Sequence, residues 1–235
     1  MDSKLLSILN LNSKSNIAIL GFFSNYPVEN YYANGNSALI LGRSDHLWAF
    51  ISSSSEAELS ALISKHHSKT KYYFSIEDWM IPLILKYGSV DWQMKTDRFV
   101  LEPNIQLNQP KSEIVKIDKS YASFMFENSD YKDFISVEYI EDRLTKDVSA
   151  GILINGKLVA WGFTHDDGAL GFLHVLNDYR KMGFGLDIVL GLIEKRKKDN
   201  KPVFGNIMPD NLPSIKLVSK LGFKLDRSVS WIKLK

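Results

Sequence analysis

The spacing of apolar residues in the N-terminal half predicts short strands interrupted by two helices. Between residues 56 and 66, Leu59, Leu62 and Ile63 recur at helical spacing and would share one face. Shorter runs rich in aromatic and β-branched residues are typical of strands. The elements expected in this half are a hairpin, a helix, a strand, a helix and a strand, over residues 37–43 with 46–51, 56–66, 71–74, 77–87 and 93–101.

The C-terminal half repeats much of this order after two helical segments. Asn155 and Gly156 form a two-residue hairpin signal between apolar runs, and Gly222 suits the left-handed position that follows a helix. The expected elements are helices at 120–126 and 136–146, strands at 149–154, 158–164 and 169–175, a helix over 186–198, a strand at 203–207, a helix at 211–221 and a strand at 229–234. The shared order favours a degenerate internal duplication, and chance similarity between two mixed sheets is the alternative.

A polar segment with two prolines separates the two halves. Pro103 and Pro110 supply no backbone donor to a sheet, so we place a linker at about 104–111. A chain of 235 residues can form one large domain or two small ones. We therefore predict two domains, at 1–110 and 111–235.

Composition narrows the classes of function. The chain is 45% hydrophobic and 24% charged with a formal net charge of +2, so no strong positive field attracts a nucleic acid. The absence of cysteine excludes disulfides, thiolate metal sites and a cysteine nucleophile. His66 and His67 have no evident third ligand, so we expect no metal site. Polar side chains interrupt the first 20 residues, so we expect no membrane span, no signal peptide and a cytoplasmic protein.

The most informative segment runs from a strand directly into a glycine-containing loop and an amphipathic helix. Free main-chain N–H groups at the start of a helix can hold phosphate oxygens. Gly183 and Gly185 let the main chain approach an anion closely, while Arg180 and Lys181 add positive charge. The spacing matches neither GxxxxGK(S/T) nor GxGxxG, which disfavours nucleotide hydrolases and nicotinamide enzymes. A diphosphate suits this loop, and a plain strand-to-helix corner is the alternative.

Three segments in the right order resemble the GNAT acetyltransferases. VLNDYRKMGFG resembles their RxxGxG coenzyme A loop, through Arg180, Gly183 and Gly185. NLPSIKLVSKLGF is similar to their NxxS/A helix, which ends in LGF. Upstream, the strand GKLVAW and the turn DGALG resemble the glycine N-acyltransferase-like branch. The resemblance covers residues 136–234.

The resemblance implies an α/β (α+β) fold of GNAT type, with a mixed, mostly antiparallel twisted sheet flanked by helices. The N-terminal lobe would be a degenerate second GNAT-like copy without the coenzyme A loop, and the C-terminal domain would bind acyl-coenzyme A. The strands at 169–175 and 203–207 would splay apart, leaving main-chain groups of Val175 and Leu176 free to bond a pantetheine arm. The N–H near Leu176 would bond the thioester oxygen.

The resemblance also implies acetyl-coenzyme A or another acyl-coenzyme A as co-substrate. Asn211 and Ser214 would hydrogen-bond its arm from the following helix, although Asn211 is equally suited to cap that helix. The residues expected to bind the co-substrate are Val175, Leu176, Arg180, Lys181, Met182, Gly183, Phe184, Gly185, Leu186, Asn211 and Ser214.

The acid and base that the family usually offers are absent. Val218 stands where a tyrosine often protonates the thiolate, and Ala169 stands where glycine N-acyltransferases carry a glutamate base. His174, on the strand before the loop, is a candidate catalytic residue because an imidazole can titrate near neutral pH, with a structural histidine as the alternative. Glu138 and Tyr139 are further candidates, whose alternative is a solvated helix face. Alignment of amine and thioester can by itself supply much of the rate.

The expected function is an N-acyltransferase, most simply an acetyltransferase, that modifies a primary amine of a small molecule or amino acid. A coenzyme A-binding sensor or interaction module without catalysis is the alternative, motivated by Val218 and Ala169. A third possibility is modification of a protein N-terminus or lysine. The expected partner is a small-molecule amine, with no nucleic acid and no membrane, and the sequence indicates no oligomeric state.

Overall fold

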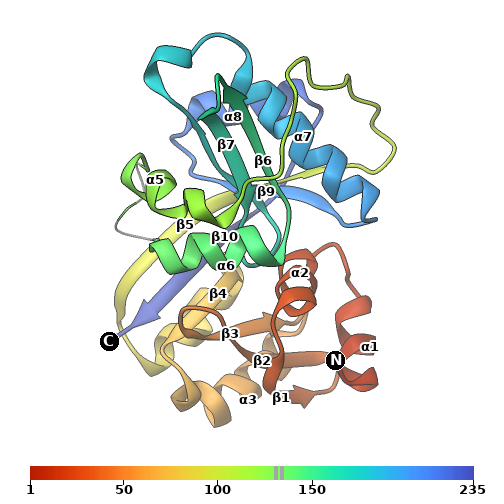
Figure 1. Ribbon diagram of the computed structural model, residues 1–235. Helices are drawn as coiled ribbons and strands as arrows, with labels where there is room; N and C mark the ends of the chain where they lie inside the picture. The colour runs from red at the N-terminus through yellow and green to blue at the C-terminus, as the bar shows by residue number, and fades with distance from the viewer. Residues whose placement is uncertain (130–131, 133–134) are drawn as a thin grey trace. The chain divides into compact units, whose positions relative to one another are not determined.

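The computed structural model describes residues 1–129, 132 and 135–235, and the chain forms two compact units (Figure 1). The first unit comprises Met1–Arg98, Ile207–Asn211 and Leu225–Lys235. The second unit comprises Phe99–Asn206 and Leu212–Lys224. The units therefore differ from the predicted division at residue 110, because the last strand of the chain returns to the first unit.

The first unit is built around a sheet with helices packed against its strands. Its elements are α1 (Ser3–Asn10), α2 (Ile17–Asn25), β1 (Val28–Asn34), β2 (Ser37–Arg43), β3 (Leu47–Ser52), α3 (Glu56–His66), β4 (Tyr72–Glu77), α4 (Ile81–Ile84), β5 (Val90–Leu101) and β10 (Lys224–Leu234). The strand order is β1-β2-β3-β4-β10-β5. Strand β3 pairs with β4 in parallel, whereas β1–β2, β2–β3 and β4–β10 are antiparallel.

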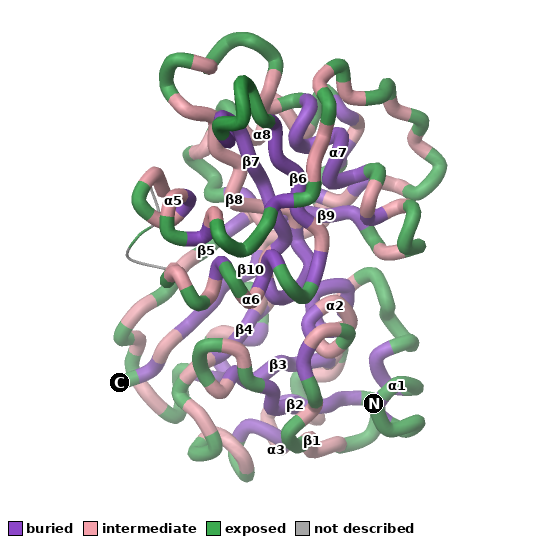
Figure 2. The backbone as a smooth tube through the Cα atoms, viewed as in Figure 1, coloured by how far each residue is buried: buried purple, intermediate pink, exposed green. Residues whose placement is uncertain are grey.

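Helices pack against both faces of the first sheet. Successive side chains of a strand point to opposite faces, and Ala38 and Ile40 pack in one apolar cluster while Leu39 and Leu41 pack in another. The first cluster includes buried residues of α1 and α2, and the second includes buried residues of α3 and α4. The continuous apolar run at 37–43 is thus explained by burial on two sides, and the tube view shows the buried positions gathered in β2 and β3 (Figure 2).

The second unit contains a three-stranded antiparallel sheet, in the order β6-β7-β8. Its elements are α5 (Ala122–Glu127), α6 (Val137–Lys146), β6 (Ser149–Ile154), β7 (Lys157–Thr164), β8 (Leu170–Val175), α7 (Phe184–Lys198), β9 (Val203–Ile207) and α8 (Leu212–Lys220). The predicted hairpin turn between β6 and β7 is confirmed, because Asn155 and Gly156 both have positive φ, at 50° and 77°. Strand β9 neighbours β5, whose residues 99–101 belong to this unit.

Helices cover both faces of the β6-β7-β8 sheet. Helix α7 lies along one face, where Ile188 and Leu192 share an apolar cluster with β6 and β7 (Figure 1). Helices α5 and α6 pack against the other face through a second cluster that contains Met125, Ile140 and Trp161. The fold is therefore α/β, with mixed, mostly antiparallel sheets flanked by helices, as predicted. Within the described residues, none of the helices combines the length and apolar character that a membrane crossing requires.

Candidate functional site

The predicted phosphate loop joins the end of β8 to the start of α7. A single 3₁₀ turn at Asn177–Tyr179 follows the strand, and Gly183 forms the N-cap of the 15-residue helix. Gly183 has a φ of 88°, a left-handed conformation that favours glycine. A Cβ built at this position would have no atom within 4 Å, so the loop is open to solvent here.

The main-chain N–H groups of this loop are largely unused within the described chain. Within the described chain, no hydrogen-bond acceptor is found for the main-chain N–H groups of residues 181–185, whereas those of Leu186 and Asp187 both donate to the Gly183 carbonyl, at 3.0 and 3.2 Å. Unpaired N–H groups and the helix dipole together make the start of a helix attractive to phosphate. The position of α7 is fixed by the Asp187 carboxylate, which accepts from the amides of Lys111 and Ser112 at 3.1 and 3.0 Å.

Two basic residues flank these amides. Arg180 and Lys181 are exposed, and Lys181 adopts a left-handed φ of 65°. The Arg180 Nε donates to the Val175 carbonyl at 3.2 Å, which ties the guanidinium to the end of β8. Met182 between Lys181 and Gly183 is also exposed. The structure thus brings the residues predicted from 180 to 186 together at the start of α7, where 180–183 and 186 are exposed and Phe184 and Gly185 are half-buried.

Strand β8 has one unpaired edge. Its one strand neighbour in the described part of the chain is β7, because β9 belongs to the other sheet. The two strands nevertheless approach at one end, where a Cβ on Gly205 would lie 3.2 Å from the Leu170 carbonyl oxygen. The predicted splay requires that β8 and β9 do not pair along their length, and the two strands lie in separate sheets.

The prediction for the Leu176 amide is wrong. This N–H donates to the Val159 carbonyl of β7 at 2.9 Å, so it is not available to a thioester. Main-chain groups of successive strand residues point to opposite edges. The groups of Val175 therefore point to the open edge, and by the same alternation so do those of Leu173.

A β-bulge at Phe172 determines this register. Trp161 pairs with His174 and Phe163 pairs with Gly171, so β8 carries one residue more than β7 between these two pairs. Phe172 takes up the extra length with a φ of 51°, which is uncommon for a bulky residue. Bulges bend a strand and redirect its side chains, and this one lies midway along the unpaired edge.

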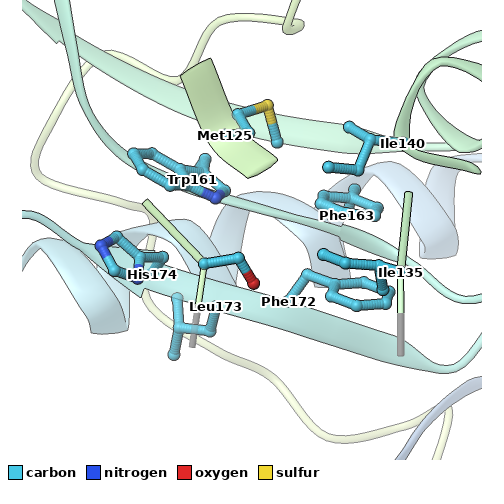
Figure 3. Close-up of a pocket in the computed structure, with 9 residues that line it drawn as sticks. Met125, Ile135, Ile140, Trp161, Phe163, Phe172, Leu173 and His174 are labelled. Carbon is cyan, nitrogen blue, oxygen red and sulfur yellow. The ribbon is translucent and has the colours of Figure 1, made fainter. Parts of the chain in front are cut away.

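A small pocket of about 70 Å³ adjoins β7 and β8 on the face covered by α5 and α6 (Figure 3). Its lining is mostly apolar and aromatic, including Met125, Ile140, Trp161, Phe163 and Phe172. His174 also lines it, with its ring stacked on Trp161 at 4.5 Å between centroids. Of the proposed catalytic residues, His174 is therefore the one that the structure places in a pocket.

Glu138 does not share this location. It is exposed in the first turn of α6 and is not among the residues that line the pocket. Its own backbone N–H and the Ser136 hydroxyl lower the pKa of Glu138, as in a carboxylate that helps to cap a helix. Tyr139 lies closer, with its ring edge-on to Phe172 at 5.9 Å. The geometry of Glu138 favours the helix-face alternative.

His165 is a residue that the sequence patterns did not single out. Its ring lies against Phe172 at 4.2 Å and occupies the space that a Cβ on Gly171 would need. Burial, with a contribution from the positive charge of Arg143, lowers the pKa of His165 to about 4. The imidazole is therefore neutral at pH 7. The one available signal was its place directly before the Asp166-Asp167-Gly168 turn.

The remaining predicted residues are distributed over both units. Asn211 belongs to the first unit and directly precedes α8, while Ser214 lies in the first turn of α8 in the second unit. Val218 is partly buried on the same helix, and Ala169 is buried immediately before β8. The role of Asn211 and Ser214 toward an acyl carrier stays a prediction.

Comparison with known proteins places this geometry among acetyltransferase-like folds. Residues 149–232, which include the loop, match the family model described as FR47-like protein. A Drosophila protein of solved structure aligns over 100% of this chain and 97% of its own, with 17% identity and a TM-score of 0.79. A GCN5-related N-acetyltransferase from Kribbella flavida aligns over 94% of both chains, with 12% identity and a TM-score of 0.61.

A tandem arrangement of the same fold also matches. A tandem GNAT protein from the clavulanic acid biosynthesis pathway aligns over 98% of this chain and 93% of its own, with 14% identity and a TM-score of 0.55. At these identities the likeness concerns the fold. The chain is thus a relative, in fold, of the GNAT acetyltransferases and contains an FR47-like region.

Proposed function

We propose that this protein is an acyl-coenzyme A-dependent N-acyltransferase, with acetyl-coenzyme A as the simplest co-substrate and a primary amine of a small molecule or amino acid as acceptor. The observation that carries the proposal is the run of unpaired amides at residues 181–185, placed at the end of a strand with an open edge. The FR47-like match over this region supports it.

The diphosphate of the co-substrate would bind at the loop. Each amide from 181 to 185 offers a donor, and Gly183 keeps the approach free of side-chain atoms. Arg180 and Lys181 would add charge-assisted bonds from the rim, with Arg180 already oriented by the Val175 carbonyl. These interactions are independent of the acyl chain, so they would bind free coenzyme A as well.

The pantetheine arm would lie along the open edge of β8. Main-chain groups of Val175 and Leu173 would bond its amides as a neighbouring strand would, and a carbonyl already bonded by Arg180 still has a second lone pair. We assign the thioester oxygen to an N–H on this edge near the Phe172 bulge, in place of Leu176. Such a donor stabilises the oxyanion that forms when the amine attacks.

The acyl transfer itself requires that the amine nitrogen bond to the thioester carbon while the carbon–sulfur bond breaks and the thiolate takes up a proton. His174 is positioned in the pocket on the far side of β8 from α7 and is the candidate to accept the amine proton. Val218 cannot donate a proton to the thiolate, so water or the acceptor would do so. The alternative function is a protein that binds coenzyme A but does not transfer the acyl group. Val218 and Ala169 favour this alternative, because they replace the acid and the base that the family usually offers.

The test compares two glycines that both have a positive φ and open space at the Cβ position. Gly183 and Gly156 both have positive φ, and a Cβ added at either would meet no atom within 4 Å, but Gly156 lies in the β6–β7 hairpin. Gly183→Asp places a carboxylate beside the loop amides, and we expect at least a tenfold weaker affinity for acetyl-coenzyme A and for coenzyme A by calorimetry. Gly156→Asp should leave both affinities unchanged.

Turnover is measured separately, as free thiol released from acetyl-coenzyme A across a panel of small amines and amino acids. Saturable, loop-dependent binding with amine-dependent thiol release supports the enzyme. Binding without release on any acceptor supports the sensor, and equal affinities of the two glycine variants would remove the loop from the proposal.

A further inference from the structure

The first unit contains a polar pocket that shares no residue with the loop or with the apolar pocket of the second unit. It lies among the segment before α2, the end of β3 and the middle of β4, and its volume is about 210 Å³. At about 30 Å³ per water molecule, this is room for roughly seven waters, the size of one sugar ring or amino acid. Leu11 and Asn12 line it and are exposed, so the pocket has access to solvent.

Ser52 presents a hydroxyl to this pocket. The residue is 6% exposed at the end of β3, where it pairs with Ala38 of β2. Its side chain, which lines the pocket, makes no hydrogen bond with any residue in the described part of the chain. A hydroxyl that makes no bond within the protein can donate to and accept from a molecule in the pocket. Ser52 is therefore available to a ligand on the pocket wall.

Ser75 lines the same pocket from β4. Its Oγ is buried and lacks a hydrogen-bond partner among the described residues. The parallel pairing of β3 with β4 ends at Phe50 and Phe74, immediately before it, and Ser75 has a φ of 55°. Non-glycine residues held in this conformation are strained and occur preferentially at binding sites. Two unpaired hydroxyls therefore lie on adjacent strands of one pocket.

The start of α2 adds further polar groups. Asn16 is the N-cap residue but makes no capping bond, because its Nδ2 donates to the Leu9 carbonyl at 2.8 Å. The Asn16 Oδ1 accepts no hydrogen bond from the described residues and lies in a side chain that lines the pocket. Ala18, in the uncapped first turn of α2, also lines it. The wall thus offers donors and acceptors that carry no net charge.

The charges around the pocket determine the class of ligand. No lysine or arginine is among its lining residues, which all lie in the described chain, so an anion would gain no ion pair. Glu77 is the lining carboxylate, and it is already bonded by Arg227 at 2.6 Å and Trp79 at 3.2 Å. A cation would therefore find this carboxylate neutralised. Hydroxyl and amide side chains, which donate and accept, match the hydroxyls of a neutral sugar or cyclic polyol.

We propose that this pocket binds a small, uncharged polyhydroxy compound of about monosaccharide size, in addition to any ligand of the second unit. The compound would bond the Ser52 hydroxyl and the Asn16 Oδ1, next to the strained backbone of Ser75. Apolar side chains such as Ile51 and Met80, which share the lining, would contact its less polar faces.

The test is calorimetry on the full chain with a panel of neutral monosaccharides and cyclic polyols, beside the matching sugar phosphates and sugar acids. We expect saturable binding of at least one neutral compound and at least tenfold weaker binding of its phosphorylated form. Failure of every neutral compound, or tighter binding of the charged set, would overturn the proposal.

Variants separate a binding hydroxyl from a structural one. Ser52→Ala should weaken binding at least tenfold without lowering the Tm of the ligand-free protein, because it removes an unpaired group. Ser54→Trp, at an exposed lining position, should block the pocket. Ser24→Ala, on the exposed side of α2, and Gly183→Asp, in the second unit, should leave binding unchanged. A Ser52→Ala protein that binds normally, or that melts at a lower temperature, contradicts the assignment.

Discussion

At the residue scale, His165 shows how local packing changes the chemistry of a side chain. Its ring packs on Phe172 and against Gly171, where burial and the nearby Arg143 disfavour the charged imidazolium. An imidazole whose pKa is lowered to about 4 is neutral over the whole physiological range. It can then act toward its surroundings only as a hydrogen-bonding ring, not as a cation.

This lowered pKa predicts an acid-sensitive stability. The ordinary pKa of 6.5 applies to the unfolded chain, so between pH 6.5 and about 4 the unfolded state binds more protons than the folded state. Stability from His165 is present above pH 6.5 and is lost as the pH falls through this window, by about 3 kcal/mol at most.

We expect His165→Gln to lose part of this pH dependence, measured as the free energy of unfolding in urea at pH 7 and pH 4.5. His46→Gln, on an exposed turn, serves as the control. If the free energy of unfolding falls by the same amount from pH 7 to pH 4.5 in His165→Gln as in the parent protein, the pKa of His165 is not lowered in the folded state.

The residue scale also shows why one site prediction failed. The loop glycines could be singled out because their signal is local, a strand that runs directly into a glycine-containing helix start. In the structure Gly183 has a left-handed backbone. The thioester donor was not predictable, because the edge to which Leu176 points depends on the bulge at Phe172. A single extra residue in a strand reverses that direction, and nothing in the sequence marks it.

At the scale of elements, a buried charge cluster joins the end of α6 to α7. The Asp147 carboxylate bonds Arg196 at 3.1 Å and Lys201 at 3.0 Å, and Arg143 lies 3.6 Å away. Burial alone would raise the pKa of Asp147, but these cations outweigh burial and the pKa lies below its ordinary value. The side chains of Asp147, Arg143 and Arg196 are almost wholly inaccessible.

Loss of this carboxylate should destabilise the protein strongly. Asp147→Asn removes the buried carboxylate that Arg143 and Arg196 share, for which we expect a loss of about 3–5 kcal/mol in the free energy of unfolding. The matched control is Asp142→Asn, which breaks a partly exposed ion pair with Lys146 on the same helix and should change stability by less than about 1 kcal/mol. Equal effects of the two variants would mean that the cluster is not a net stabiliser.

Helices and strands were predicted accurately where a short stretch of sequence contains the whole pattern. The strand at 203–207 and the helix at 56–66 have the predicted bounds, because both are short apolar patterns with clear ends. No element was predicted before residue 37, although α1 carries Leu5, Ile8 and Leu9 at helical spacing. Polar residues around these three positions obscure the helical spacing in the sequence. In the structure the three side chains are buried in the first apolar cluster, which stabilises the helix.

At the scale of the molecule, the chain order and the folding units do not coincide. The sheet order places β10 between β4 and β5, although its residues follow the whole second unit in sequence. Val229 and Trp231 of β10 belong to the same buried cluster as Phe50 and Phe74. Patterns along a chain identify strands but not their neighbours, so the sequence predicted a division near residue 110 and could not predict this return.

The arrangement predicts that the N-terminal region cannot fold alone. A fragment of residues 1–110 lacks β10, so both strands that flank it would have unpaired edges and part of the core would be exposed. We expect this fragment to lack cooperative thermal unfolding by circular dichroism. A peptide of residues 224–235 added in trans should restore cooperativity and shift Trp231 fluorescence to shorter wavelength.

A control peptide with Val229 and Trp231 both replaced by Asp should have no effect. Cooperative unfolding of the fragment without any peptide would show that β10 is dispensable for the first unit.

The late position of β10 also has a consequence for biosynthesis. About 120 residues separate the end of β5 from the start of β10, and at ~5–20 residues per second the ribosome takes roughly 6 to 24 s to cover them. During that interval β4 and β5 are both translated but their shared neighbour is not. A nascent chain in this state exposes the unpaired edges of β4 and β5, with which a strand of another copy can pair. Translation speed and chaperone supply should therefore influence how much of the protein folds correctly.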